Sequence, residues 1–174
     1  VEAVSMQFPV KYEESMNTVL VQECIRYQNL LLEVIKSLKA VQNALKGLAV
    51  LSADLEAMAN AMFNQKIPAM WESKAYPCMK PLNSWVDEFL QRLEFIQSWI
   101  NNGKPHAYWI SGFFFPQAFV TGNTSNYARK LQIPIDTVSF DFKIHPVPAL
   151  DISAPPEDGC FVFGLFLEGA RFDL

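Results

Sequence analysis

Residues 104–136 read KPHAYWISGFFFPQAFVTGNTSNYARKLQIPID, and the rest of the protein has to be arranged around this stretch. The eight large apolar side chains between Tyr108 and Val120 carry too much area to stay in water at about 25 cal/mol per Å². Pro116 fixes its own φ and biases Phe115 toward an extended backbone. We therefore predict a buried extended segment, a stop at Gly112, and a helix with Pro116 in its first turn. The helix should end near residues 129–130, and the weak helix formers TGNTSN predict an irregular middle.

The aromatic side chains of this stretch are the candidate site residues, and they have two interpretations. They are Trp109, Phe113, Phe114, Phe115 and Phe119. In one interpretation the rings are core and fill the junction between a helical layer and a sheet. In the other, part of the patch docks another domain, because Trp and Phe often anchor interfaces. The residues by themselves leave both open.

Length and composition favour one folded domain, with or without an appendage. The chain has 174 residues, of which 51% are hydrophobic and 13% aromatic, enough to build a substantial core. A formal net charge of −4, with scattered Lys and Arg, argues against nucleic-acid binding. Membrane insertion is also excluded, because no run approaches the ~20 apolar residues that span a bilayer. The start lacks Met and the end, GARFDL, is abrupt, so we expect a piece of a longer protein.

A long helical seam follows Pro9, with apolar residues at alternating steps of four and three. The seam consists of Leu20, Cys24, Tyr27, Leu31, Val34, Leu38, Val41, Leu45 and Leu48. A second apolar stripe consists of Val21, Ile25, Leu30, Leu32 and Ile35. Two stripes favour a bundle helix buried on more than one side over a two-stranded coiled coil. Ser37 is a candidate cap for a second helix, which would break the run there.

Further helices are predicted downstream. Ser52 can cap a helix that runs to about Phe63. A proline-punctuated connector follows, with one helical turn around Trp71. The pattern then returns over residues 83–102, where Gly103 provides a stop.

The period changes to two beyond Pro134. The alternation of Val138, Phe140, Phe142 and Ile144 with polar residues predicts a half-buried strand. Residues 159–167 predict a second, buried strand. Two strands rarely make a stable sheet alone. The predicted fold class is therefore α+β and predominantly α. We expect residues 1–174 to be a single fragment. In it, a multi-helix bundle over about 12–132 is followed by a short, incomplete antiparallel β segment over about 135–174.

Motifs for chemistry are sparse. The sequence contains neither GxxxxGK[ST] nor GxGxxG, so no phosphate cradle is expected. The adjacent carboxylates Glu13–Glu14, Asp87–Glu88 and Glu157–Asp158 are better explained as solvated pairs than as acid and base catalysts. His106 and His145 stand alone in proline-flanked loops. Cys24, Cys78 and Cys160 are too far apart for a metal motif and fit a reducing intracellular compartment. Arg171, Glu168 and Asp173 could form an ion-pair cluster.

Six segments, taken in order from about Tyr12, carry a family resemblance. They are SMNTVLVQECIRYQNLL, LKGLAVLSADLEAM, IPAMWESKAYPCMKPLNSWVDEFLQRLEFIQSWI, YWISGFFFPQAFVTG, NYARKLQIPID and PEDGCFVFGLFLEGARFD. Together they resemble the C-terminal domain of dynein heavy chains. SGFFFPQAF, NYARK with IPID, and GLFLEGAR are the most specific. SGFFFPQAF and IPID are more similar to the sequences of axonemal heavy chains than to those of cytoplasmic heavy chains. The overall sequence is similar to the inner-arm type.

The resemblance implies a function that the residues alone do not indicate. It implies a non-catalytic helical layer with a β-barrel-like end, lying on one face of the ATPase ring of a minus-end-directed microtubule motor. This layer would support the ring and modulate motor activity in ciliary or flagellar movement. The implied location is the cytoplasm and cytoskeleton, in the axoneme of a cilium.

The resemblance also implies that the chemistry lies elsewhere in the parent polypeptide. Nucleotide sites with ATP and Mg²⁺, the microtubule-binding stalk and the linker would all lie outside this sequence. The fragment should then be no enzyme, hold no cofactor or metal of its own, and contact the rest of the motor ring intramolecularly. Family members continue past GARFD with more strands, so the fragment is expected to be truncated before its last strands.

A free-standing helical scaffold or adaptor that binds protein partners through the aromatic patch is the alternative. An enzyme is a third hypothesis, and it would need converging titratable groups that the sequence does not indicate. If the fragment is truncated, the unpaired apolar strand over 159–167 should seek a partner by strand addition or exchange between copies, or fray.

Overall fold

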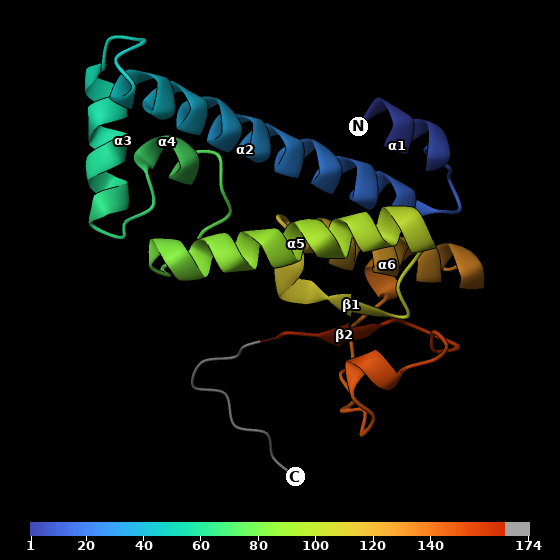
Figure 1. The fold of residues 1–174 in the computed structure, drawn as a ribbon. Coiled ribbons are helices and arrows are strands. Elements are labelled where there is room, and N and C mark those ends of the chain that lie inside the picture. Colours follow the sequence, from blue (N-terminus) through green and yellow to red (C-terminus); the bar gives the residue numbers. More distant parts are fainter. Residues whose placement is uncertain (166–174) are drawn as a thin grey trace.

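The computed structural model describes residues 1–165, which form a group of helices above a two-stranded sheet (Figure 1). The α-helices are α1 (Glu2–Gln7), α2 (Ser15–Leu45), α3 (Ala53–Phe63), α4 (Ala69–Glu72), α5 (Leu82–Asn102) and α6 (Pro116–Leu131). The strands are β1 (Ala107–Trp109) and β2 (Phe161–Phe163), with short 3-10 turns at Ile110–Gly112, Ile135–Thr137 and Ala149–Asp151. The predicted class, α+β and predominantly α, is confirmed.

The long helix α2 follows the predicted seam without a break as far as Leu45, whereas Leu48, the last residue of the predicted seam, lies beyond the helix. Leu20, Cys24 and Tyr27 are all buried along it. Ser37 does not start a new helix, because its hydroxyl donates to the carbonyl of Glu33 at 2.7 Å, inside the same helix. The same Ser37 oxygen accepts the indole N–H of Trp71, on α4, at 2.8 Å. Ser37 therefore joins two helices instead of capping one.

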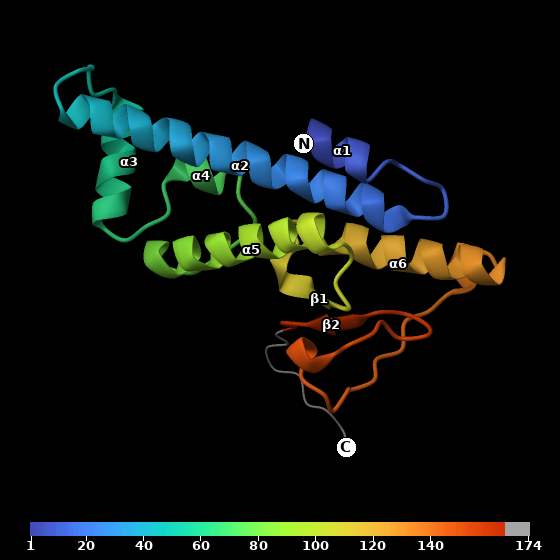
Figure 2. The same cartoon turned by 45° about the vertical axis from the view of Figure 1, so that its right-hand side comes forward.

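The prediction that α2 is buried on more than one side is wrong for most of its second stripe. Leu30 is fully buried, but Ile25, Leu32 and Ile35 are 42%, 55% and 39% exposed. The helices α3 to α6 lie below α2 in Figures 1 and 2, and the short α1 lies above its N-terminal half, where the side-chain amide of Gln7 donates to the carbonyl of Ile100 on α5 at 3.0 Å. A face of α2 with apolar side chains is therefore left in water.

The shorter helices begin and end close to the predicted residues. Ser52 caps α3, and its hydroxyl oxygen accepts the N–H of Leu55 at 3.4 Å. The single turn predicted around Trp71 is α4. Helix α5 begins one residue earlier than expected, after Pro81, and ends at Gly103, which adopts φ 85°. Positive φ is the backbone conformation that favours glycine, so this stop follows from the sequence.

Helix α6 confirms the prediction for Pro116 and corrects the prediction of an irregular middle. Pro116 is its first residue, and the helix continues without interruption to Leu131. The weak helix formers TGNTSN are tolerated because their side chains bond within the helix, as Thr124 does to the carbonyl of Val120 at 3.0 Å. Gly122 also lets α6 approach α2, since a Cβ there would lie 2.6 Å from the terminal methyl of Met16. Packing outweighs intrinsic propensity here.

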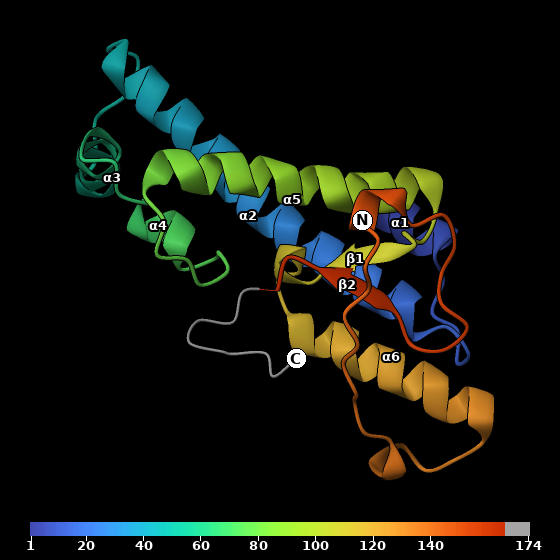
Figure 3. The ribbon, with the colours of Figure 1, turned by 90° about the horizontal axis from the view of Figure 1, so that it is seen from below.

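The sheet differs from the predicted one in orientation and in membership. Strands β1 and β2 pair in parallel, with Ala107 opposite Phe161, so the predicted antiparallel arrangement is wrong. A parallel pair needs a long crossover connection, which α6 and the loops after it supply. Figure 3 shows the two strands side by side, with α5 and α6 on either side of them.

The strand predicted over Val138–Ile144 is wrong, because this segment is an extended loop. Phe140, Phe142 and Ile144 are all exposed. Alternation predicts a strand only where a neighbouring strand offers hydrogen bonds, and within 1–165 no strand pairs with this segment. The other predicted strand contains β2, whereas positions 166 and 167 lie outside the described residues.

Aromatic residues make up half of the buried core cluster. Four of these rings pack together around Trp85 of α5. The ring centroids of Trp71 on α4, Tyr76 in the connector before α5, and Phe89 on α5 lie 5.3–6.2 Å from that of Trp85. Within residues 1–165, no helix combines the length and the apolar character needed to cross a membrane.

Candidate docking surface

The turn that connects β1 to α6 is held by a hydroxyl from α2. The phenolic O–H of Tyr27 donates to the carbonyl of Gly112 at 2.6 Å. Gly112 lies directly on the indole of Trp109, since a Cβ there would be 2.6 Å from the ring. The side chain of Tyr27 is buried, and burial raises the pKa of its hydroxyl. The hydroxyl is therefore a neutral donor that fixes the turn.

A buried carboxylate holds the residues after this turn. Glu23 of α2 is 0% exposed and accepts the backbone N–H groups of Phe114 and Phe115, the second at 3.1 Å. These N–H groups come just before α6, whose N-cap residue Phe115 provides no side-chain cap. Glu23 thus caps α6 from another helix, and a negative charge is favourable at that end.

Burial raises the pKa of Glu23 above its ordinary value of 4.5. The two backbone N–H donors lower this pKa, as do the charges of Arg26 and Arg92, but they do not cancel the effect of burial. The carboxyl group therefore holds the turn at a cost in desolvation.

Arg92 of α5 completes the network. Its Nε donates to Glu88 at 2.9 Å, and its Nη1 donates to the carbonyl of Phe113 at 3.3 Å. The guanidinium also lies 3.6 Å from the ring centroid of Tyr76. Burial raises the pKa of Glu88, but hydrogen bonds from Lys80 and Arg92 outweigh burial and leave it below 4.5. Arg92 therefore joins α5 to the same turn that Glu23 and Tyr27 hold from α2.

The five candidate aromatics are divided between interior and surface. Phe113 and Phe119 are buried and stack with centroids 4.7 Å apart. Trp109 and Phe114 are half-buried. Phe115 is 45% exposed, and the guanidinium of Arg26 lies 5.3 Å from its ring centroid. Phe114 and Phe115, the two adjacent residues that Glu23 fixes by their backbone, thus both approach the surface, as Trp109 also does. Whether these rings dock a partner stays a prediction.

A groove of about 580 Å³ opens beside Phe114, and we call it the α2 groove. It is lined by Arg26, Asn29, Leu32, Glu33 and Lys36 of α2, by Lys74 of the connector after α4, and by Phe114. Glu33 and Lys74 form an ion pair across it. The α2 groove therefore combines an exposed apolar floor at Leu32 with charged edges.

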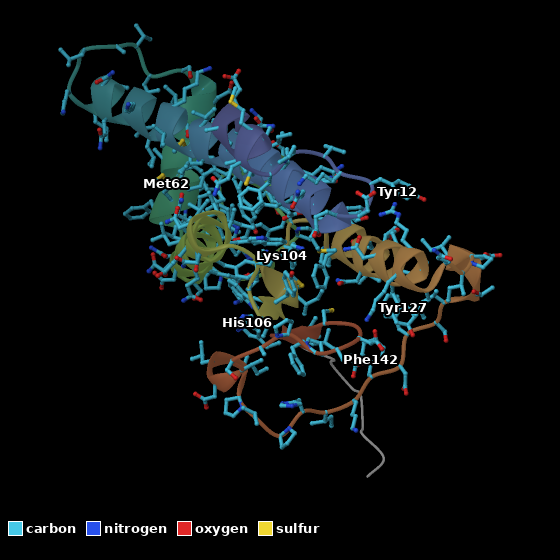
Figure 4. The ribbon with its side chains drawn as sticks, turned by 90° about the vertical axis from the view of Figure 1, so that its right-hand side faces the viewer. Tyr12, Met62, Lys104, His106, Tyr127 and Phe142 are labelled. Atoms are coloured by element: carbon cyan, nitrogen blue, oxygen red, sulfur yellow. The ribbon has the colours of Figure 1, made fainter. Side chains whose placement is uncertain are left out.

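A smaller hollow of about 320 Å³ lies between α6 and the loops on either side of the sheet. Lys104, His106 and Tyr127 line it, and Figure 4 shows these side chains around the space between α6 and the strands. Its cations are already paired, Lys104 with Glu14 and Lys130 with Asp158. It resembles a packing seam more than a ligand site.

Among the other candidate groups of the sequence, His106, Cys160 and the Glu157–Asp158 pair all line this smaller hollow, whereas Cys24, Cys78 and His145 lie elsewhere. His106 contacts the carbonyl of Ile152 at 3.3 Å, and His145 lies with its ring 4.8 Å from that of Phe161. Burial raises the pKa of the Cys24 thiol to about 11, as expected for a core residue. Over the described range, no three His, Cys, Asp or Glu side chains gather where a metal could bind.

Comparison with known proteins supplies the family. The family model described as the C-terminal domain of the dynein heavy chain matches residues 1–174. The protein belongs to this family. It is 54% identical to dynein axonemal heavy chain 1 of Rattus norvegicus over 99% of its own length. It is 49% identical to dynein axonemal heavy chain 3 of Homo sapiens and 47% identical to dynein axonemal heavy chain 12 of Mus musculus, again over 99% of its length.

This dynein C-terminal domain spans only a small part of those relatives, namely 4% of heavy chains 1 and 3 and 6% of heavy chain 12. The resemblance carried by SGFFFPQAF and NYARK is thereby confirmed at the level of the axonemal heavy chains. GLFLEGAR extends beyond residue 165, and the expected cluster of Glu168, Arg171 and Asp173 lies wholly outside the described residues.

Sequence reasoning about this dynein C-terminal domain missed the two residues that organise the turn. Glu23 lies among the seam residues Leu20, Cys24 and Tyr27, and Arg92 lies between Phe89 and Ile96. A charged residue inside an apolar stripe was the available signal, because such residues are rarely buried without a partner. The partners themselves come from distant segments, so the sequence does not identify them.

Proposed function

We propose that this protein is the non-catalytic C-terminal domain of an axonemal dynein heavy chain, which packs on the ATPase ring of the same polypeptide and modulates motor activity. The observation that carries the proposal is the family match over residues 1–174. Identities near 50% to three axonemal heavy chains support ciliary or flagellar movement as the process and the axoneme as the location.

The way the structure is braced supports a mechanical role. Glu23, Tyr27 and Arg92 all bond to the backbone of residues 112–115, so α2, α5 and the start of α6 are tied at one point. A layer tied in this way can transmit force between surfaces that contact different parts of a ring. Exposed apolar side chains on α2, such as Leu32, provide one surface on which such contact can form.

We further propose that ATP and Mg²⁺ bind only in the rest of the heavy chain, and that microtubules are contacted only through other domains. An isothermal titration of the 174-residue protein with MgATP is the direct test. We expect no saturable heat. Saturable, stoichiometric binding would contradict the non-catalytic assignment.

Modulation is tested in the motor. A protease site placed before residue 1 of this domain would allow its release from a purified heavy-chain motor after folding. We expect cleavage and removal to change microtubule-gliding velocity and microtubule-stimulated ATPase activity while nucleotide binding by the ring persists. The control is a motor with the protease site inserted in an exposed loop, so that the chain is cleaved but the C-terminal domain is retained. Unchanged velocity and ATPase activity after removal would refute modulation.

The scaffold or adaptor alternative makes a different prediction about the transcript. A free-standing adaptor would be encoded without ATPase modules upstream of this segment. The relatives at 54%, 49% and 47% identity are all named as heavy chains, which favours the motor proposal. Sequencing the full transcript separates the two.

A further inference from the structure

The α2 groove is an apolar surface that no other segment of the described residues covers. Leu32 lies at its floor and is 55% exposed. Ile25 lies seven residues before Leu32, and Ile35 lies three residues after it, so the three side chains share one face of α2. The exposed ring of Phe115 adjoins the groove through its contact with Arg26. The groove is thus one part of a larger apolar surface.

The apolar positions have the spacing of a helix-binding surface. Steps of seven and three along α2 form a ridge of the kind that packs against a second helix. Phe114 adds a ring to the other side of the groove. Its position is fixed, because Glu23 accepts its backbone N–H. A prepared surface of this kind recognises amphipathic helices through apolar anchors one turn apart.

The charges at the edges select the polarity of that helix. The groove is lined by three cations, Arg26, Lys36 and Lys74, and by one carboxylate, that of Glu33. Lys74 pairs with Glu33 and Arg26 pairs with the buried Glu23, so among the described residues Lys36 is the lining cation without an ion-pair partner. The whole sequence, by contrast, carries a formal net charge of −4. A local excess of positive charge on an acidic domain favours a partner with carboxylates beside its apolar residues.

We propose that the α2 groove docks an amphipathic helix bearing acidic side chains from the remaining part of the same heavy chain. This deepens the proposed function and rests on it. In dynein axonemal heavy chain 1, 96% of the length lies outside the segment matched here (100% − 4%). The rest of the same polypeptide therefore supplies ample surface for this contact. Tethering on one polypeptide gives such a segment a high effective concentration.

The test uses photo-cross-linking in the intact heavy-chain motor. Asn29 lines the groove and is exposed, so it is replaced by a photoreactive residue, p-benzoylphenylalanine. Asn43 is the matched control, because it is also an exposed Asn of α2 and faces nearly the same way, about 40° away by the 3.6-residue period. It lies beyond the groove. We expect an intramolecular cross-link from position 29 to a helix that carries acidic residues, and loss of that product when the probe is at position 43.

Two further variants test the chemistry of the contact. Leu32→Glu should abolish the cross-link from position 29, whereas Leu48→Glu, at a 75% exposed residue in the turn after α2, should retain it. Lys36→Glu should reduce its yield several-fold, and Lys36→Arg should retain it. Circular dichroism confirms that each variant folds.

The outcomes separate this inference from the proposed function. A cross-link to a second copy or to a different protein overturns the inference, as does a cross-link to a basic segment or no cross-link at position 29. In those cases lysine-reactive cross-linking of the same motor shows whether other faces of the domain contact the ring. If they do, only the groove assignment fails. If no face contacts the ring, the proposed function fails as well.

Discussion

Glu23→Ala is the sharpest test of how the turn before α6 is built. Glu23 is fully buried and accepts two backbone N–H groups, those of Phe114 and Phe115. Hydrogen bonds to a charged group contribute about 1.5–3 kcal/mol each, and part of that is offset here by the desolvation of the carboxylate. We therefore expect a loss of roughly 3 kcal/mol in the free energy of unfolding. For a protein of this length that corresponds to a fall in Tm of roughly 6–12 °C.

The assay is thermal unfolding followed by circular dichroism, with hydrogen exchange at the amides of Phe114 and Phe115. Glu33→Ala is the matched control, because Glu33 lies on the same helix and pairs with the half-exposed Lys74. Such a pair contributes about 1 kcal/mol or less. Glu23→Gln keeps one acceptor oxygen and should lose about 1 kcal/mol near neutral pH. Equal losses for Glu23→Ala and Glu33→Ala would refute the capping role, as would unchanged protection of both amides.

The pH dependence of Glu23 has a definite sign. Its folded-state pKa is raised above the ordinary value of 4.5, so the folded protein binds this proton more tightly than the unfolded protein does. Stability from this group is fully present below about pH 4.5 and is lost as pH rises through the folded-state pKa. The advantage of the wild type over Glu23→Gln should therefore shrink from pH 4.5 toward neutral pH in urea unfolding. An advantage that grows over this range would be evidence against the buried carboxyl group.

Two other contacts give predictions with clear readouts. Gly164→Ala should destabilise the sheet by about 1–3 kcal/mol and raise hydrogen exchange in β1, because a Cβ there would lie 2.4 Å from the Trp109 ring at φ 73°. Gly159→Ala is its control, since it has a similar φ of 77° but no atom within 4 Å, and equal effects would contradict the steric argument. Ser37→Ala should cost about 1–3 kcal/mol in urea unfolding, because it leaves the indole N–H of Trp71 buried without its acceptor. A change below about 0.5 kcal/mol, the usual range of surface substitutions, would show that this bond is not needed.

The sequence by itself determined helices α2 to α6, but it left open which rings of the 104–136 stretch are core. Helical periodicity, the cap at Ser52 and the stops at Gly103 and Gly112 are local signals, readable because each depends on a few neighbouring residues. Pro116 likewise specified the first residue of α6, since a proline is best tolerated there. The motif SGFFFPQAF identified the family for the same reason, being contiguous.

Only the tertiary structure decided which side chains meet across the molecule. The orientation of β1 and β2 depends on the crossover through α6, and the loop at 138–144 lacks a strand partner within the described residues although its pattern alternates. Glu23 and Arg92 bond to backbone groups of the turn that lie more than 20 residues away, and no local pattern encodes such a pairing. The exposure of Leu32 has the same origin. An apolar residue on a helix is buried only if another segment covers it, and coverage is a property of the whole packed molecule.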